Sequence, residues 1–401
     1  MFVWKECSLS DLGTIVGGAT PSTKKIENYE NGKISWITPK DLAGLNGRFI
    51  KKGERNITET GLKSCSAKLM PKHSILFSSR APIGYVAIAE QEMCTNQGFK
   101  SIVPNDNTDY MFLYYLLKYN KNKIESLGSG TTFKEISGKV MGNVTVNIPV
   151  NKKDQVKIAS ILSIIDEKIE LNTKINNNLE QQAQAIFKSW FIDFEPFDGN
   201  MLDNWHDGIV ADLAREIICG KTPSTKKEEY YGGDTPFITI PDMHGCVYNV
   251  KTERYLSQRG VESQPKKTLP PNSVCVSCIG TAGLITLVSE ESQTNQQINS
   301  IIPKEGISPY YIYLLMQTKS EIINKLGQSG STIVNLNKTQ FGKIKIIIPS
   351  LDIMQKFNDI CSPLFEKILL NQKENIRLAV LRDGLLPKLM SGELDISNID
   401  I

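Results

Sequence analysis

A six-residue motif, Thr20-Pro21-Ser22-Thr23-Lys24-Lys25, returns letter for letter at residues 222–227. The match extends outward from both copies. Upstream, Asp11-Leu12 aligns with Asp212-Leu213, and downstream Thr95-Asn96-Gln97 aligns with residues 294–296. The offset stays within a few residues of 200 along the chain. Because self-similarity at a constant spacing indicates a repeated architecture, the sequence predicts a tandem duplication that covers nearly all of it.

Each half has the same internal order. A block with short β-branched runs and many turn residues comes first (1–150 and 201–350), and a helical pattern follows (151–200 and 351–401). We therefore expect an α+β fold, in which two globular mixed α/β blocks are separated by two long helices.

Apolar residues recur at three-and-four spacing in both helical segments, which is typical of a helix with a seam along one face. About 39 residues at 1.5 Å each predict a rod of roughly 58 Å. Asn172 and Asn371 take equivalent seam positions. A buried Asn would fix the register, because only the correct pairing satisfies both amides. A solvated seam edge is the alternative. Within the blocks, residues 110–127 and 310–326 each predict one further helix.

The charge is distributed unevenly along the 401 residues. The chain has 46 Lys and Arg against 43 Asp and Glu, for a net charge of +3. Split at the repeat boundaries, the net charge is +6 in the first block, −2 in its helical segment, +1 in the second block and −2 in the tail. The blocks are net basic and the helices net acidic, so the small total charge hides segments of opposite sign. The start lacks a signal-peptide pattern, and eight Cys in a long chain favour a reducing cytoplasm.

Catalytic and metal-binding constellations are missing from the sequence. Three His are too few and too scattered for a hydrolytic centre. Cys275 and Cys278 form a C-x-x-C pair, but the corresponding residues of the first half are Leu76 and Ser79. We therefore expect no catalytic residue and no metal site, and we interpret the two Cys as half-buried strand residues.

The repeated motif carries hydroxyls, a turn-setting Pro and two cations, which suit hydrogen bonds to phosphate oxygens. Arg, Asn and Gln elsewhere in the blocks have the fork and amide geometries that read guanine and adenine. Solvated loops and amides that cap strands are the alternatives for these residues. The candidate DNA-binding residues are Thr20, Ser22, Lys24, Lys25, Lys51, Lys52, Arg55, Arg80, Asn96, Gln97, Thr131, Thr132, Lys134, Thr222, Ser224, Lys226, Lys227, Lys251, Arg254, Gln296, Gln297, Ser331 and Thr332.

The two blocks share framework motifs but differ between them. Residues 78–82 read Ser-Ser-Arg-Ala-Pro, whereas the corresponding residues 277–281 read Ser-Cys-Ile-Gly-Thr. A duplicated reader whose variable stretches have diverged would recognise two different half-sites. Long helices between the blocks would then set the distance between those half-sites.

This order of motifs resembles the specificity subunit of Type I restriction–modification systems over essentially the full chain. Each block opens near a Gly-x-Thr-Pro-Ser element and closes with Ile-Pro, at Ile148-Pro149 and Ile348-Pro349. Residues 186–194 (IFKSWFIDF) resemble the end of the family's central spacer, and residues 385–394 (LLPKLMSGEL) its C-terminal end. The motifs are short, but their order, occurring twice, is specific.

The resemblance implies target recognition domains at 1–150 and 201–350, a conserved helical spacer at 151–200 and a C-terminal conserved helical region at 351–401. It implies coiled-coil-like antiparallel helices in a pseudo-twofold molecule. It also implies that this chain binds double-stranded DNA, no membrane and no cofactor, and performs no chemistry. Two modification subunits would bring S-adenosylmethionine and methylate adenine, and motor-nuclease restriction subunits would use ATP and Mg²⁺ to cleave DNA.

Two other functions are open to a chain of this composition. One is a self-contained DNA methyltransferase or nuclease, which the missing catalytic motifs disfavour. The other is a duplicated scaffold that binds only proteins. Salt-dependent DNA binding by the assembled complex separates the last possibility from a DNA reader.

Overall fold

The computed structural model describes residues 2–45, 47–80, 82–129, 134–327 and 335–399. They belong to two compact units, with residues 1–170 and 377–401 in unit 1 and residues 171–376 in unit 2. Both dividing points lie inside a long helix, α6 (Lys152–Phe191) or α12 (Leu351–Met390). Each unit is therefore one block together with a part of both helices.

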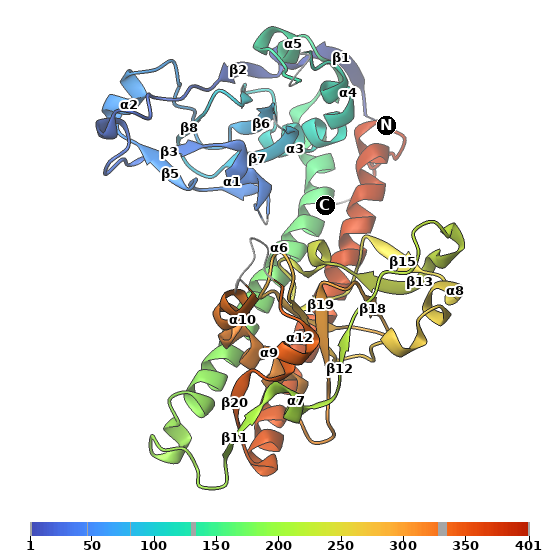
Figure 1. The fold of residues 1–401 in the computed structure, drawn as a ribbon. Coiled ribbons are helices and arrows are strands. Elements are labelled where there is room, and N and C mark those ends of the chain that lie inside the picture. The colour runs from blue at the N-terminus through green and yellow to red at the C-terminus, as the bar shows by residue number, and fades with distance from the viewer. Residues whose placement is uncertain (1, 46, 81, 130–133, 328–334, 400–401) are drawn as a thin grey trace. The chain divides into compact units, whose positions relative to one another are not determined.

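Unit 1 is built around a five-stranded sheet with strand order β2-β9-β6-β7-β4 (Figure 1). A three-stranded sheet, β5-β3-β8, and a strand pair, β1-β10, complete its block. The strands are β1 (Trp4–Ser8), β2 (Gly13–Gly17), β3 (Ile34–Ile37), β4 (Phe49–Ile50), β5 (Arg55–Ile57), β6 (Ile75–Ser79), β7 (Ile83–Ala89), β8 (Met93–Thr95), β9 (Lys100–Pro104) and β10 (Thr145–Pro149). The helices are η1 (Leu9–Asp11), η2 (Ile26–Asn28), α1 (Pro39–Ala43), α2 (Glu59–Lys63), α3 (Tyr110–Tyr119), α4 (Lys121–Ser126) and α5 (Gly138–Gly142).

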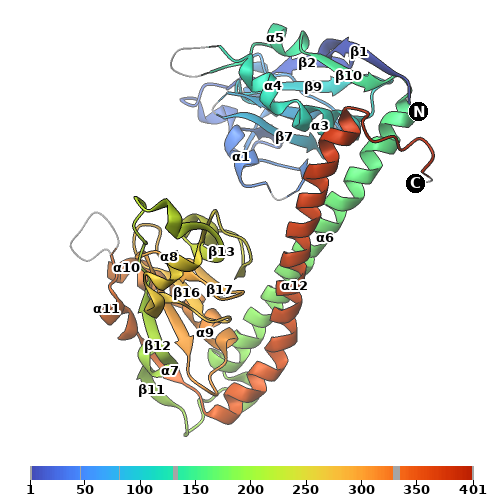
Figure 2. The same cartoon turned by 90° about the vertical axis from the view of Figure 1, so that its right-hand side faces the viewer.

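Unit 2 repeats this topology strand for strand (Figure 2), with sheets β12-β19-β16-β17-β14, β15-β13-β18 and β11-β20. Its strands are β11 (His206–Ile209), β12 (Ala214–Cys219), β13 (Tyr231–Ile238), β14 (Tyr248–Asn249), β15 (Arg254–Leu256), β16 (Val274–Ser277), β17 (Ile285–Val288), β18 (Gln293–Thr294), β19 (Ile298–Pro303) and β20 (Lys345–Ile348). Its helices are η3 (Glu195–Phe197), α7 (Val210–Leu213), η4 (Glu228–Tyr230), η5 (Ile240–Met243), α8 (Gln258–Glu262), η6 (Pro265–Lys267), α9 (Pro309–Thr318), α10 (Ser320–Gly327) and α11 (Lys338–Gly342).

The strand register repeats as well. Ile75 of β6 lies opposite Ile88 of β7, and Val274 of β16 lies opposite Leu287 of β17. A slip of one residue would turn every side chain of a strand to the other face of the sheet. The shared strand order and register therefore confirm that the sequence repeat is a structural repeat.

The core of each block lies around its central strand. β6 and β16 are buried along their whole length and begin with the apolar runs Ile75-Leu76-Phe77 and Val274-Cys275-Val276, which is typical of strands covered on both faces. α3 packs on β6 and β7, and α9 packs on β16 and β17. Burial of these strands and helices holds each block together.

The helix expected over residues 110–127 is in fact two helices, α3 and α4, and residues 310–326 likewise hold α9 and α10. The expectation of one helix in each block is therefore wrong. In the first block, the side-chain amide of Asn120 donates to the carbonyl of Leu116 at 2.9 Å. The same carbonyl also accepts the backbone N–H of Asn120 at 3.0 Å, and α3 ends because the backbone of Asn120 leaves the α-helical region (φ −87°, ψ 7°), as that of Lys319 does between α9 and α10 (φ −95°, ψ 0°).

The two long helices pack antiparallel within each unit. In unit 1, Lys157 Nζ donates to the carbonyl of Ser397, a few residues after the end of α12, at 2.8 Å, whereas Asp166 Oδ1 accepts from Arg382 Nη1 of α12 at 2.7 Å. The partner's number therefore falls as the number along α6 rises, as the family resemblance implied. Within the described residues, no helix combines the length and apolarity needed to cross a membrane.

Asn172 and Asn371 are both buried between the two helices of unit 2. Asn172 Nδ2 donates to Glu374 Oε2 at 2.6 Å and to Asn375 Oδ1 at 2.9 Å. Asn371 Nδ2 donates to Asn176 Oδ1 at 2.8 Å. A shifted register would leave these buried amides without partners, so a register-setting role stays our prediction for both.

Candidate nucleic-acid interface

The repeated motif folds into the same turn in both units. The backbone N–H of Lys25 donates to the carbonyl of Ser22 at 3.3 Å, and that of Lys227 donates to the carbonyl of Ser224 at 3.2 Å. Such a bond over three residues closes a β-turn. The four side chains are exposed, so the hydroxyls and ammonium groups expected to meet phosphate face solvent.

In each unit, a tyrosine forms a hydrogen bond to the residue just before the turn. The hydroxyl of Tyr29 donates to the Pro21 carbonyl at 2.6 Å, and the hydroxyl of Tyr231 donates to the Pro223 carbonyl at 2.8 Å. Burial raises the pKa of both tyrosines, so they stay protonated donors at neutral pH. Sequence reasoning missed both residues, although each follows a copy of the motif at the same short distance.

A threonine of each motif reaches the strand turn that carries the candidate amides. Thr20 Oγ1 donates to Gln97 Oε1, and Thr222 Oγ1 donates to Gln296 Oε1 at 2.8 Å. The structure thus brings four of the predicted residues together in two equivalent pairs. Each Gln is exposed and held by its oxygen, which orients its NH₂ group as a hydrogen-bond donor.

Asn96 has a structural contact in this turn. Its Oδ1 accepts from the backbone N–H of Gly98 at 2.8 Å. The equivalent Asn295 accepts from the backbone N–H of Gln297 at 3.0 Å and donates to its Oε1 at 3.0 Å. The Asn side chains therefore shape the turn, and the neighbouring Gln residues lie further toward solvent.

Glycine is required where the motif meets this turn. A Cβ on Gly18 would lie 2.0 Å from the Asn96 carbonyl oxygen, and one on Gly220 would lie 2.2 Å from the Asn295 carbonyl oxygen. The backbones can approach this closely only where no side chain intervenes. The Gly of the Gly-x-Thr-Pro-Ser element therefore seats the motif against the amide turn.

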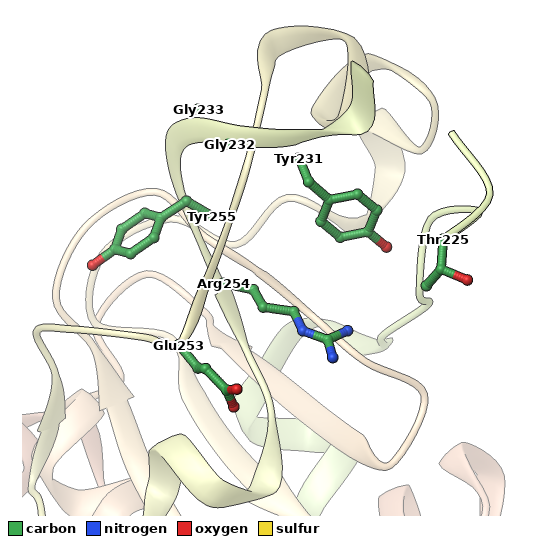
Figure 3. Close-up of a pocket in the computed structure, with 7 residues that line it drawn as sticks. All are labelled: Thr225, Tyr231, Gly232, Gly233, Glu253, Arg254 and Tyr255. Atoms are coloured by element: carbon green, nitrogen blue, oxygen red, sulfur yellow. The ribbon is translucent and has the colours of Figure 1, made fainter. Parts of the chain in front are cut away.

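A surface hollow lies beside each copy of the motif. The hollow of unit 2, of about 480 Å³, is lined by Thr225, Tyr231, Gly232, Gly233, Glu253, Arg254 and Tyr255 (Figure 3). The hollow of unit 1, of about 590 Å³, is lined by Thr23, Lys24, Ile26, Tyr29, Glu30, Arg55 and Asn56. Both contain the second Thr of the motif, the turn-holding Tyr and an Arg at the first position of an equivalent strand.

The arginines are available within these hollows. In Figure 3, the guanidinium group of Arg254 lies below the ring of Tyr231 and points toward the loop that carries Thr225. Arg55 and Arg254 are exposed, and neither forms an ion pair within the ranges that the structure describes. A planar guanidinium in this position can bind a phosphate oxygen pair.

A repeated aspartate positions each arginine. Asp41 Oδ1 accepts from the backbone N–H of Glu54 at 2.7 Å, and Asp242 Oδ1 accepts from that of Glu253 at 2.8 Å. The other carboxylate oxygen accepts from the backbone and hydroxyl of a Thr three residues earlier. The arginine that lines the hollow, Arg55 or Arg254, is the residue immediately after this Glu. Each Asp stands at the same place in its half of the repeat, and its role is to fix the loop that presents the arginine.

The other predicted cations lie at the surface. Lys24, Lys51, Lys52, Lys134, Lys226 and Lys251 are exposed. Lys227 Nζ donates to the Tyr230 hydroxyl at 3.0 Å, which raises the pKa of the ammonium group. Thr131, Thr132, Ser331 and Thr332 lie outside the described residues.

Two stretches of the chain match one family model. Residues 3–181 and 203–379 each match the Type I restriction modification DNA specificity domain. The chain belongs to this family of specificity subunits. The Type I restriction enzyme MjaIX specificity subunit of Methanocaldococcus jannaschii is 34% identical, over 99% of this chain and 94% of the relative. The HindI specificity subunit of Haemophilus influenzae is 33% identical, over 98% and 99%. A crystal structure of the Type I restriction-modification S subunit from M. genitalium has a TM-score of 0.62 at 20% identity, covering 97% of this chain and 96% of that one.

The chain is thus the DNA-specificity component of a Type I restriction–modification system and not a catalytic one. The expected family and fold class are confirmed. The alternative of a self-contained methyltransferase or nuclease is excluded by relatives that match along almost their whole length and are specificity subunits.

Arg48, a basic residue close in sequence to the candidate DNA-binding residues, has a structural role in the specificity subunit. Arg48 is buried, and its Nε and backbone N–H both donate to Glu170 Oε1 of α6 at 3.0 Å. Its Nη2 donates to Glu170 Oε2 at 3.2 Å. In unit 2, Gln372 Oε1 of α12 accepts from the backbone N–H of Tyr248 at 3.1 Å. Each block is therefore tied by hydrogen bonds to the helix that follows it.

The C-x-x-C cysteines of the specificity subunit belong to the core, so the expectation that they are half-buried strand residues is wrong: both are fully buried, and Cys278 follows the end of β16. Burial raises the pKa of both thiols to about 12. Both are therefore protonated near neutral pH, and Cys275 packs against Ser300 with Sγ and Oγ 3.4 Å apart. Among the residues that the structure describes, no three His, Cys, Asp or Glu side chains are grouped as metal ligands.

Proposed function

We propose that this specificity subunit reads an asymmetric, bipartite site in double-stranded DNA, with one block on each half-site. The observation that carries this proposal is the hollow that occurs twice, once in each block, with the same Thr, Tyr and Arg and the same Tyr-to-Pro and Thr-to-Gln hydrogen bonds. Two equivalent cationic sites on one chain fit two equivalent stretches of phosphate backbone. The proposed recognition domains are residues 1–150 and 201–350.

The helical regions, residues 151–200 and 351–401, are the proposed docking sites for modification subunits. Leu171 of α6 is 52% exposed, and Leu370 at the equivalent position of α12 is 63% exposed. Large apolar side chains exposed on otherwise acidic helices favour a protein partner. Their occurrence at equivalent positions supports two such subunits for each specificity subunit.

The partner subunits would supply the chemistry. S-adenosylmethionine would be bound by the modification subunits, and ATP and Mg²⁺ by motor-nuclease restriction subunits. The complex would act in the cytoplasm, because that is where its DNA substrate lies in a bacterial or archaeal cell.

The proposal is tested with the full-length chain assembled with its modification subunit. We expect the complex to select a bipartite sequence from a pool of random duplexes, and its affinity to fall linearly with the logarithm of the salt concentration. Adenine methylation mapped in a host with and without the gene should show the same sequence. A complex that assembles without salt-dependent DNA binding would identify the chain as a protein scaffold.

The hollow arginines give a further prediction. We expect Arg55→Ala and Arg254→Ala each to weaken binding of the assembled complex to all duplexes alike, because a phosphate contact carries no sequence information. Each change should reduce the slope of log affinity against log salt concentration by about 1. Titration of labelled duplexes by fluorescence anisotropy at several salt concentrations measures both quantities.

Lys40→Ala is the matched control for these arginines. Lys40 is an exposed cation of the same block, but its Nζ is paired with Glu54 at 2.8 Å and it does not line the hollow. We expect this change to leave the slope as it is. Equal effects of Lys40→Ala and Arg55→Ala would show that the hollow makes no contact of its own.

A further inference from the structure

The two blocks share backbone hydrogen bonds at the end of their central strands. The backbone N–H of Ile136 donates to the carbonyl of Ser79 at 3.0 Å, and that of Leu336 donates to the carbonyl of Cys278 at 3.0 Å. Beside these bonds, isolated bridges join residue 80 to residue 135 and residue 279 to residue 335. The backbone frame is therefore the same in both blocks at this place.

The side chains on this frame are charged in unit 1. Glu135 lies between two cations, with Arg80 Nη1 3.6 Å from its Oε2 and Lys100 Nζ 3.5 Å from its Oε1. These distances are longer than those of a good hydrogen bond. Arg80 is 35% exposed and Glu135 is 42% exposed, whereas Lys100 is largely buried. A partly exposed donor fork and a partly exposed carboxylate thus lie side by side and can exchange their loose ion pair for bonds to a ligand.

The equivalent positions of unit 2 carry no charge. Ile279 takes the place of Arg80, Asn335 that of Glu135, and Asn299 that of Lys100. Asn299 is buried, and its Nδ2 donates to the carbonyl of Leu336 at 3.1 Å. In unit 2, the same backbone arrangement therefore presents the half-buried apolar side chain of Ile279 and the exposed amide of Asn335.

In a duplicated DNA-reading domain, residues that are the same in both copies and residues that differ between them have different roles. Parts that are the same in both blocks can contact only what two different half-sites have in common, which is the phosphate backbone. Residues that differ between the blocks but occupy the same backbone position lie at the same place relative to each half-site. There they contact different bases. The hollow arginines belong to the first class, and residues 80 and 135 with residues 279 and 335 belong to the second.

We propose that Arg80 and Glu135 determine specificity in the first block by reading a G·C base pair, and that Ile279 and Asn335 read an A·T pair at the equivalent place in the second. Arginine donates two bonds to guanine O6 and N7, and glutamate accepts from cytosine N4. An apolar side chain contacts the methyl group of thymine, and asparagine pairs with adenine N6 and N7. This inference rests on the DNA-reading function proposed above.

The test exchanges the residues at these positions between the two blocks. The variant Arg80→Ile with Glu135→Asn is assembled as the full-length chain with its modification subunit, and a pool of random duplexes is selected and sequenced. We expect the preference for G·C at one position of one half-site to fall by about tenfold to a hundredfold, while the other half-site keeps its preferences. The reciprocal variant, Ile279→Arg with Asn335→Glu, should create a G·C preference in the other half-site only.

The outcomes separate this inference from the proposed function. If the unaltered complex selects no sequence, the DNA-reading function fails. If it selects a bipartite sequence and the double variant selects the same one, or loses preference equally in both halves, the assignment of these residues is overturned. If the double variant does not assemble, Arg80→Lys decides: it keeps the charge but lacks the fork, so the G·C preference should weaken, and an unchanged preference overturns the assignment.

Discussion

One heptad inserted into each long helix is expected to lengthen the spacer between the two half-sites by about three base pairs. Seven helical residues add about 10 Å, and base pairs are stacked about 3.4 Å apart. The insertions belong between Glu170 and Leu171 in α6 and between Ile376 and Arg377 in α12, where the chain divides into its two units. Placed there, they leave the internal contacts of each unit uncut.

The antiparallel packing explains why both helices must be lengthened. Arg382 pairs with Asp166 in unit 1, and Asn371 pairs with Asn176 in unit 2. Equal insertions preserve both pairings. A heptad in α6 alone serves as the control, because it leaves seven residues of one helix unmatched and should impair assembly with the modification subunit. Adenine methylation mapped in the host measures the spacer, and an unchanged spacer in the double insertion would show that the helices do not set it.

Phe357→Ala is expected to lower the free energy of unfolding of unit 2 by about 3–5 kcal/mol, as large-to-small changes in a packed core do. Phe357 is fully buried in α12. Its ring centroid lies 5.0 Å from that of Phe191, 6.1 Å from Trp190 and 6.2 Å from Phe187, all on α6. Truncation would remove edge contacts to several rings at once and leave a cavity between the helices.

Urea denaturation followed by tryptophan fluorescence measures this effect, because Trp190 and Trp205 report on unit 2. Leu370→Ala is the matched control on the same helix. Leu370 is exposed, so its truncation should change the free energy of unfolding by no more than about 0.5 kcal/mol. Equal losses for the two variants would mean that the aromatic cluster does not stabilise the unit.

Most of the fold could be predicted because its signals are local. The two copies of the motif, the change from strand patterns to a helical period and the lengths of α6 and α12 are all legible along the chain. The error at residues 110–127 has a local cause of another kind. Apolar spacing continues past Asn120 and Lys319, but the backbone leaves the α-helical region at both residues, and the spacing of apolar side chains does not report backbone angles.

The sequence predicted which residues belong to the candidate site, but not which of them contact one another. Thr20 and Gln97 were both candidates, yet their hydrogen bond joins positions 77 residues apart. Tyr29 and Thr23 were missed as site residues, because Tyr29 lies outside the motif and nothing in the motif distinguishes Thr23 from its other residues. Repetition was the one signal that could have found them, since Thr225 takes the place of Thr23 within the second motif and Tyr231 takes that of Tyr29 after it.

By itself, the sequence determined that one pattern is used twice, that two long helices follow the two blocks, and that the blocks are basic and the helices acidic. Only the tertiary structure decided which cations are free for DNA. Arg48 and Arg55 lie seven residues apart, but Arg48 is buried against Glu170, 122 residues away, and Arg55 is exposed and lines a surface hollow. Charge is a property of the residue, whereas exposure and partners depend on what the folded chain brings beside it.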